Sequence, residues 1–145
     1  LKDVINSIIK RAASPEPMEF LDLRSCLSFH VENYFVICED PAMRVIVSMG
    51  DQSVQNIPEL AAIGHELTQS GMEGIARTIT ETAARTGVAV TDPGFFAASL
   101  LDLAAGHYTR VRIGKLRSDF ASYKFAARRI VSLLVAGIGA EAAGA

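Results

Sequence analysis

Two successive segments in the second half of the chain carry more apolar surface than one small core can cover. Residues 95–105 read FFAASLLDLAA, and residues 120–136 read FASYKFAARRIVSLLVA. A helix at the surface of a globular protein usually carries an apolar stripe only about 100° wide. We therefore expect both segments to be helices that are covered on two sides, by their own domain and by a second copy of the chain. Asp92–Gly139 is predicted to be a dimerisation hairpin.

The chain before this hairpin has the periodicity of further helices, so the predicted fold class is all-α. Apolar residues recur every three or four positions from Leu1 to Ala12, and a proline stands near the start of each of the next four predicted helices. Proline is tolerated in the first turn of a helix, where its missing N–H would have no partner. Asn56 is predicted to cap a helix that stops at Gly87. The predicted bundle has about six helices, at 1–13, 16–38, 41–50, 58–85, 92–113 and 119–139.

Composition narrows the class of protein. The 145 residues fit one domain, half of them are hydrophobic, and the net charge of −2 gives no overall electrostatic footprint for nucleic acid. Cys26 and Cys38 fall in one predicted helix about 18 Å apart, which is too far for a disulfide and favours a reducing compartment. The apolar runs are too short to span a bilayer. These features predict a cytoplasmic protein with no membrane partner.

Residues that could carry catalysis are few. Cys26 and His30 are four positions apart and share a helix face, but no neighbouring carboxylate or second metal-spaced histidine completes a site. His65-Glu66-Leu67-Thr68-Gln69 resembles the zinc motif HExxH, with Gln69 where the second histidine should stand. We therefore expect no enzyme activity, no metal and no cofactor.

Two helix faces of mixed polarity predict a ligand pocket instead. Ligand pockets are mostly apolar and contain a few polar groups that orient the ligand. The faces carry aromatic, sulfur-containing and hydrogen-bonding side chains, and residues of the neighbouring helices could complete the wall. The predicted ligand-binding residues are Cys26, Phe29, His30, Asn33, Met43, Val47, His65, Thr68, Met72, Phe96 and Leu100. The alternative is that these residues are ordinary core.

The order of these signals resembles the C-terminal effector domain of the tetracycline-repressor (TetR/AcrR) family of bacterial transcription regulators. The resemblance covers essentially the whole chain. It is carried by DPAMRVIVSMGDQSVQNIPELA at 40–61, where a short helix leads into a long one, and by TDPGFFAASLLDLAAGHYTRVRIG at 91–114, ahead of the last apolar helix.

The resemblance implies a two-part regulator that represses or otherwise controls transcription. Residues 1–13 would end the helix that connects to an absent N-terminal DNA-binding domain, and residues 14–145 would bind a small, largely apolar effector and dimerise. Operator DNA would be contacted only by the helix-turn-helix of the missing domain. The last two helices of each subunit would form a four-helix bundle in a homodimer, with contacts from Leu101, Ala105, Tyr108, Tyr123, Ala127, Ile130 and Leu134.

Three functional hypotheses remain open on the sequence alone. The first is the effector-binding and dimerisation domain of a TetR-like regulator. The second is a helical dimerisation or protein-interaction module that binds no ligand, in which the mixed faces are plain core. The third is a small all-α enzyme that uses Cys26, His30 or His65.

Overall fold

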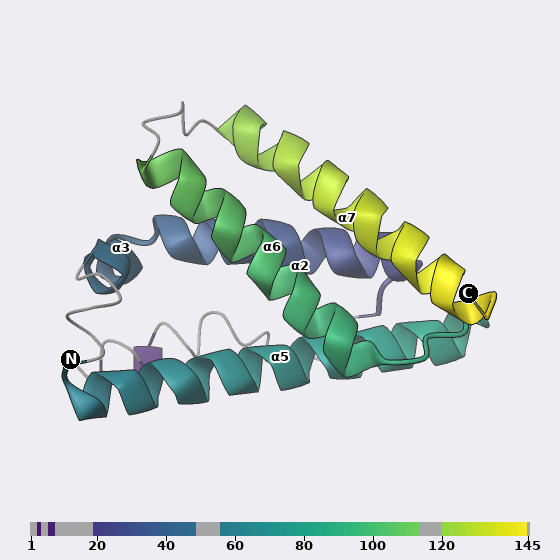
Figure 1. Ribbon diagram of the computed structural model, residues 1–145, viewed down its shortest axis with the longest axis horizontal. Helices are drawn as coiled ribbons and strands as arrows, with labels where there is room; N and C mark the ends of the chain where they lie inside the picture. The colour runs from purple at the N-terminus through teal and green to yellow at the C-terminus, as the bar shows by residue number, and fades with distance from the viewer. Residues whose placement is uncertain (1–2, 4–5, 8–18, 49–55, 114–119, 145) are drawn as a thin grey trace.

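The computed structural model of the protein describes residues 3, 6–7, 19–48, 56–113 and 120–144. Within these ranges the chain forms helices and no strand, which confirms the all-α prediction. The helices are α2 (Leu23–Glu39), α3 (Pro41–Ser48), α5 (Pro58–Thr86), α6 (Pro93–Ile113) and α7 (Phe120–Ala142) (Figure 1). The predicted helix at 1–13 and the predicted turn at 114–118 lie almost wholly outside the described residues, so the predicted total of six helices stays a prediction.

The start of α2 differs from the prediction. The sequence pattern placed it near Glu16, but residues 19–22 are not helical and the helix begins at Leu23. The Asp22 carboxylate accepts a hydrogen bond from the Ser25 backbone N–H over 2.7 Å, which is the usual role of an N-cap. Because Phe20 precedes the helix, its backbone is not helical and its side chain can turn into the core, where it is 7% exposed.

The boundaries of α5 and α6 follow the signals in the sequence more closely. Gly87 ends α5 with a φ of 71°, a left-handed conformation that favours glycine. Asp92 caps α6 by accepting from the Phe95 N–H over 2.9 Å. The predicted cap at Asn56 is wrong, because Ile57 occupies the N-cap position of α5 and no side chain caps it.

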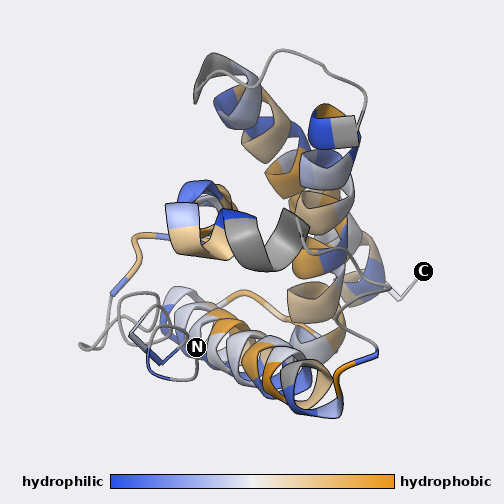
Figure 2. Cartoon of the chain, turned by 90° about the vertical axis from the view of Figure 1, so that its left-hand side faces the viewer, coloured by the Kyte–Doolittle hydropathy of each residue, from blue (hydrophilic) through white to orange (hydrophobic). Residues whose placement is uncertain are grey.

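The core lies where α2 meets α5, α6 and α7. In Figure 1, α6 crosses in front of α2 and α5, and α7 runs antiparallel to it. In the view of Figure 2, α5 forms the lower edge of the molecule, with α2 and α3 above it. Cys26, Leu27 and Val31 of α2 are fully buried, so this helix is the centre around which the others pack.

Polar contacts hold the C-terminal end of α2 in place. The Tyr108 hydroxyl donates to the carbonyl oxygen of Cys38 over 2.8 Å. The Tyr123 hydroxyl donates to Glu39 Oε1 over 2.9 Å. These two bonds connect α2 to both hairpin helices and satisfy polar groups at a helix end that would otherwise be costly to bury.

Candidate functional site

A polar cluster joins α2 to α5 inside the apolar core. The Thr78 hydroxyl oxygen lies 2.7 Å from His30 Nε2 and 3.6 Å from Cys26 Sγ. The same hydroxyl donates to the carbonyl oxygen of Ile75 over 2.9 Å. Because its single proton is used there, the Thr78 oxygen accepts from the Cys26 S–H and from His30 Nε2–H. This network assigns the histidine proton to Nε2 and leaves Nδ1 as a hydrogen-bond acceptor.

Aromatic rings surround His30. Its ring centroid lies 5.3 Å from that of Phe29 in an edge-to-face arrangement and 5.9 Å from that of Phe20. The Phe20 and Phe29 rings lie 5.4 Å apart. The imidazole is therefore a polar group with aromatic walls, and this combination suits an apolar ligand that carries one hydrogen-bonding group.

Burial keeps the titratable groups of this cluster uncharged. Desolvation lowers the pKa of His30 to about 4. Burial likewise raises the pKa of the Cys26 thiol, against smaller opposing effects of its hydrogen bonds with Thr78 and Thr82. The nucleophilic form of cysteine is the thiolate, so the pair is arranged as a neutral thiol beside a neutral imidazole.

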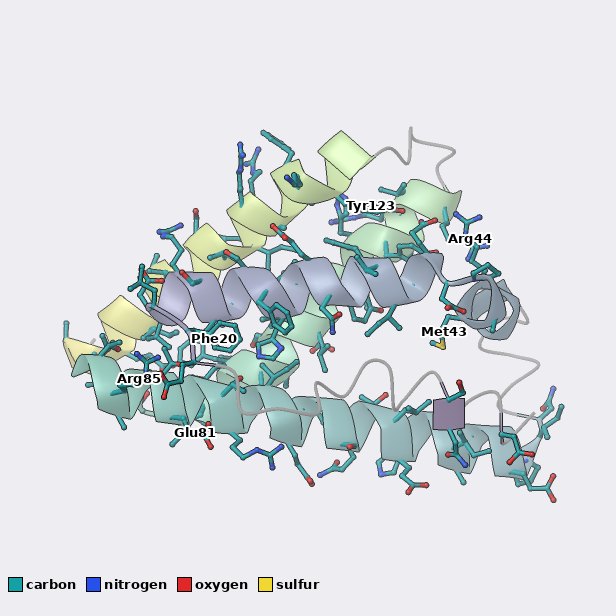
Figure 3. The ribbon with its side chains drawn as sticks, turned by 180° about the vertical axis from the view of Figure 1, so that it is seen from behind. Phe20, Met43, Arg44, Glu81, Arg85 and Tyr123 are labelled. Carbon is teal, nitrogen blue, oxygen red and sulfur yellow. The ribbon has the colours of Figure 1, made fainter. Side chains whose placement is uncertain are left out.

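The structure brings together only some of the predicted ligand-binding residues. Cys26, Phe29 and His30 meet at the cluster with Thr78. Phe96 and Leu100 are buried in the core, and Asn33, Met43 and Met72 are half-buried. Met43 lies on α3, at the opposite end of α2 from Phe20 (Figure 3). The side chain of Val47 lies outside the described residues.

His65 and Thr68 do not join the cluster. Both are exposed on the N-terminal half of α5, and the Thr68 hydroxyl donates to the carbonyl oxygen of Gly64 in its own helix. His65 is thirteen residues before Thr78, which corresponds to about 20 Å along the helix axis. Periodicity assigns residues to a face of α5, but it does not show which part of that long face lies against α2.

Sequence reasoning missed Phe20 and Thr78 as members of the site. Phe20 falls within the predicted helix at 16–38, whereas it belongs to the segment before α2. Thr78 lies on the same face of α5 as Gly71 and Gly74 and was not among the predicted ligand-binding residues. Thr78 could have been predicted by searching the facing helix for a hydroxyl that can hydrogen-bond to both Cys26 and His30.

A separate cleft of about 290 Å³ lies on the other side of α2. It is mostly apolar, and the Phe35 and Tyr123 rings in its wall stack with centroids 4.7 Å apart. None of the predicted ligand-binding residues contributes to it. Its lining is Glu32, Phe35, Val36, Glu39, Asp40, Tyr123 and Lys124.

The hairpin helices bury most of the residues that were predicted to form the dimer interface. These side chains belong to the core of the single subunit, and Leu101 and Ala105 are half-buried. The buried ones are Tyr108, Tyr123, Ala127, Ile130 and Leu134. A partner would have to contact other residues, and α6 and α7 do expose large apolar side chains, namely Phe95, Leu103, Phe125 and Leu133. The interface prediction therefore selected the inner face of the hairpin.

No family model, curated protein or solved structure matches this chain. Across the described helices, none is both long and apolar enough to cross a bilayer. Within the same ranges, no three His, Cys, Asp or Glu side chains gather in a way that could hold a metal ion.

Proposed function

We propose that this chain is the effector-binding and dimerisation domain of a TetR-like transcription regulator. The observation that carries the proposal is the exposed apolar face of the α6–α7 hairpin. Phe95 is 57% exposed, Phe125 is 61% exposed and Leu133 is 64% exposed. Large apolar side chains grouped on one surface of a soluble protein commonly mark an interaction site. A homodimer in which this face is shared would form the four-helix bundle that the resemblance implies.

The proposed effector site is at His30, where α2 packs on α5. Nδ1 of His30 offers a hydrogen-bond acceptor, and Phe20 and Phe29 offer apolar walls. A small, largely apolar molecule with one hydroxyl or N–H donor fits this chemistry. A cation is disfavoured, because the surroundings of His30 already disfavour a positive charge and hold its pKa at about 4.

The mechanism follows from the geometry of a dimer on DNA. Two recognition helices must be about 34 Å apart to enter successive major grooves. In the proposal these helices belong to a helix-turn-helix outside residues 1–145. An effector that separates α2 from α5 would favour a conformation with another spacing, and operator affinity would fall by the difference in its affinity for the two conformations.

A second candidate is a helical dimerisation module that binds no ligand. The observation in its favour is that His30 Nε2, Cys26 and Thr78 already satisfy one another. His65 and Thr68 moreover lie away from them. In this alternative the cluster is a polar contact that orients α2 on α5, and the hairpin alone carries the function.

Sedimentation at micromolar concentration tests the part that both candidates share. We expect the chain to be a dimer, and Leu133→Asp to make it a monomer. Val88→Asp is the matched control, because Val88 is also an exposed apolar residue, at 43%, but lies outside the hairpin. A monomeric wild-type chain would contradict both candidates.

A thermal-shift screen with small apolar alcohols and amides separates the two candidates. If the effector site exists, some compounds will raise the melting temperature of the wild-type chain, and His30→Phe will abolish the shift because it removes the acceptor Nδ1. Compounds that stabilise both proteins equally, or none at all, favour the ligand-free module.

A further inference from the structure

The two hairpin helices run antiparallel (Figure 1), and two contacts define which of their residues lie at the same height. The Tyr108 ring stacks on the Tyr123 ring with centroids 6.1 Å apart. Towards the other end, a Cβ atom placed on Gly137 would lie 3.5 Å from Phe96 Cε1. Position 96 is therefore level with position 137, and position 108 with position 123.

The outer face of the hairpin consists of one stripe from each helix. Each of these residues is exposed or half-buried, and helical spacing places all of them opposite the buried ones except Leu133, which lies at the margin of the outer face. On α6 the stripe is Phe95, Ala98, Asp102 and Gly106, and on α7 it is Phe125, Arg129, Leu133 and Ala136.

Residues at the same height on these two stripes are complementary in size and charge. Asp102 is midway along the paired region and is level with Arg129. Gly106, one turn further along α6, is level with the ring of Phe125. Towards the start of α6, Phe95 is level with the small side chains near the end of α7. Each bulky or charged residue of one stripe therefore has a small or oppositely charged residue at its own height on the other.

This complementarity is not used within the subunit. The Arg129 guanidinium lies over the Phe125 ring, 5.6 Å from its centroid. Within one chain no ion pair joins Asp102 to Arg129, whereas among the described residues an ion pair joins Arg44 to Glu39.

We propose that a second copy of the chain packs on this face with α6 lying against α7 of the partner. Asp102 then pairs with Arg129 of the partner subunit, and Gly106 receives Phe125 of the partner subunit. The inference rests on the proposed dimer and adds its docking geometry. A twofold axis parallel to the helices produces this arrangement, because the rotation exchanges the two helices while each residue keeps its height.

The other symmetric arrangement is disfavoured by charge. A twofold axis perpendicular to the helices would place α6 on α6 of the partner subunit. Asp102 lies near the middle of the hairpin, so it would face a second Asp102, and Arg129 would face a second Arg129. Like charges brought together at an interface are strongly unfavourable.

Charge reversal tests the pairing in the full chain. Asp102→Arg and Arg129→Asp should each weaken the dimer about 100-fold or more, because each places like charges in contact. The double variant carries both reversals and restores the opposite-charge pair, so it should recover most of the dimer affinity. Circular dichroism of each variant checks that the exposed substitutions leave the subunit folded.

A size test needs no change of charge. Apart from its chain neighbours and the backbone of its own helix, no described atom lies within 4 Å of a Cβ placed on Gly106, so Gly106→Leu leaves the fold of the subunit intact. It should nevertheless weaken the dimer by excluding Phe125 of the partner subunit, and Phe125→Ala in the same chain should restore it. Gly71→Leu, on the exposed face of α5, is the control and should leave the dimer unchanged.

The outcomes distinguish the docking geometry from the proposed function. A monomeric wild-type chain overturns both. A wild-type dimer in which the double charge reversal stays as weak as the single variants, or in which no single variant matters, overturns the docking geometry and leaves the dimer standing. Rescue in both pairs of variants establishes α6 against α7 of the partner subunit.

Discussion

The Thr78 hydroxyl should contribute to stability mainly through its hydrogen bond with His30. Thr78→Val keeps the shape of the side chain but removes the oxygen that lies 2.7 Å from His30 Nε2. A buried donor left without an acceptor costs about 1–3 kcal/mol. Since His30 is half-buried rather than fully enclosed, we expect a loss of about 1–2 kcal/mol in the free energy of unfolding. With a urea m-value of about 1–3 kcal/mol/M, the unfolding midpoint should fall by roughly 0.3–2 M.

A double-mutant cycle isolates this bond from other effects of the substitution. In a His30→Phe background the donor is absent, so Thr78→Val should cost less than about 0.5 kcal/mol, which leaves a coupling energy of about 1 kcal/mol. Thr80→Val is the matched control, because the Thr80 hydroxyl also donates to a carbonyl of its own helix but is exposed on α5. Equal costs of Thr78→Val in the two backgrounds would refute the assigned bond and tautomer.

Three further predictions concern other parts of the fold. His30 binds a proton below about pH 6.5 in the unfolded chain and only below about pH 4 in the folded chain. Acidification from pH 7 to pH 4 should therefore lower the free energy of unfolding by up to about 3 kcal/mol, which urea titration at each pH would measure. His30→Phe should flatten this pH dependence. Tyr108→Phe removes the donor to the buried Cys38 carbonyl and should cost about 1–2 kcal/mol by the same assay; an unchanged midpoint would show that the bond is not made. Gly87→Ala places a Cβ on a residue with a φ of 71° and should lower the free energy of unfolding by about 1–2 kcal/mol. Gly71→Ala lies inside a helix with open space around it and should stabilise the protein. Melting temperatures of the two variants that shift in the same direction in calorimetry would contradict this.

Local signals in the sequence determined much of the helical framework. The proline at position 93 behind Asp92 starts α6, and Gly87 stops α5, because caps and left-handed glycines act within a few residues of where they stand. The same signals failed at the start of α2. Pro15 and Pro17 suggested an early start, but the Asp22 cap and the burial of Phe20 place it at Leu23.

The candidate site was only partly predictable because a helical pattern specifies direction around an axis but not position along it. Cys26 and His30 are four residues apart on α2, so their shared face follows from the sequence. The choice of Thr78 rather than His65 or Thr68 as their partner depends on where α5 crosses α2. That position is set by packing between helices that are distant in the chain.

The sequence alone established that the hairpin segments have too much apolar surface for one side of a helix. It could not say which side of each helix faces inward. When a helix is apolar around most of its circumference, the hydrophobic pattern does not single out one face. Only tertiary packing decided it, by stacking Tyr108 on Tyr123 inside the subunit and leaving Phe125 and Leu133 outside. The physical reason is that burial free energy depends on the area covered by neighbours, and those neighbours are known only once the whole chain is folded.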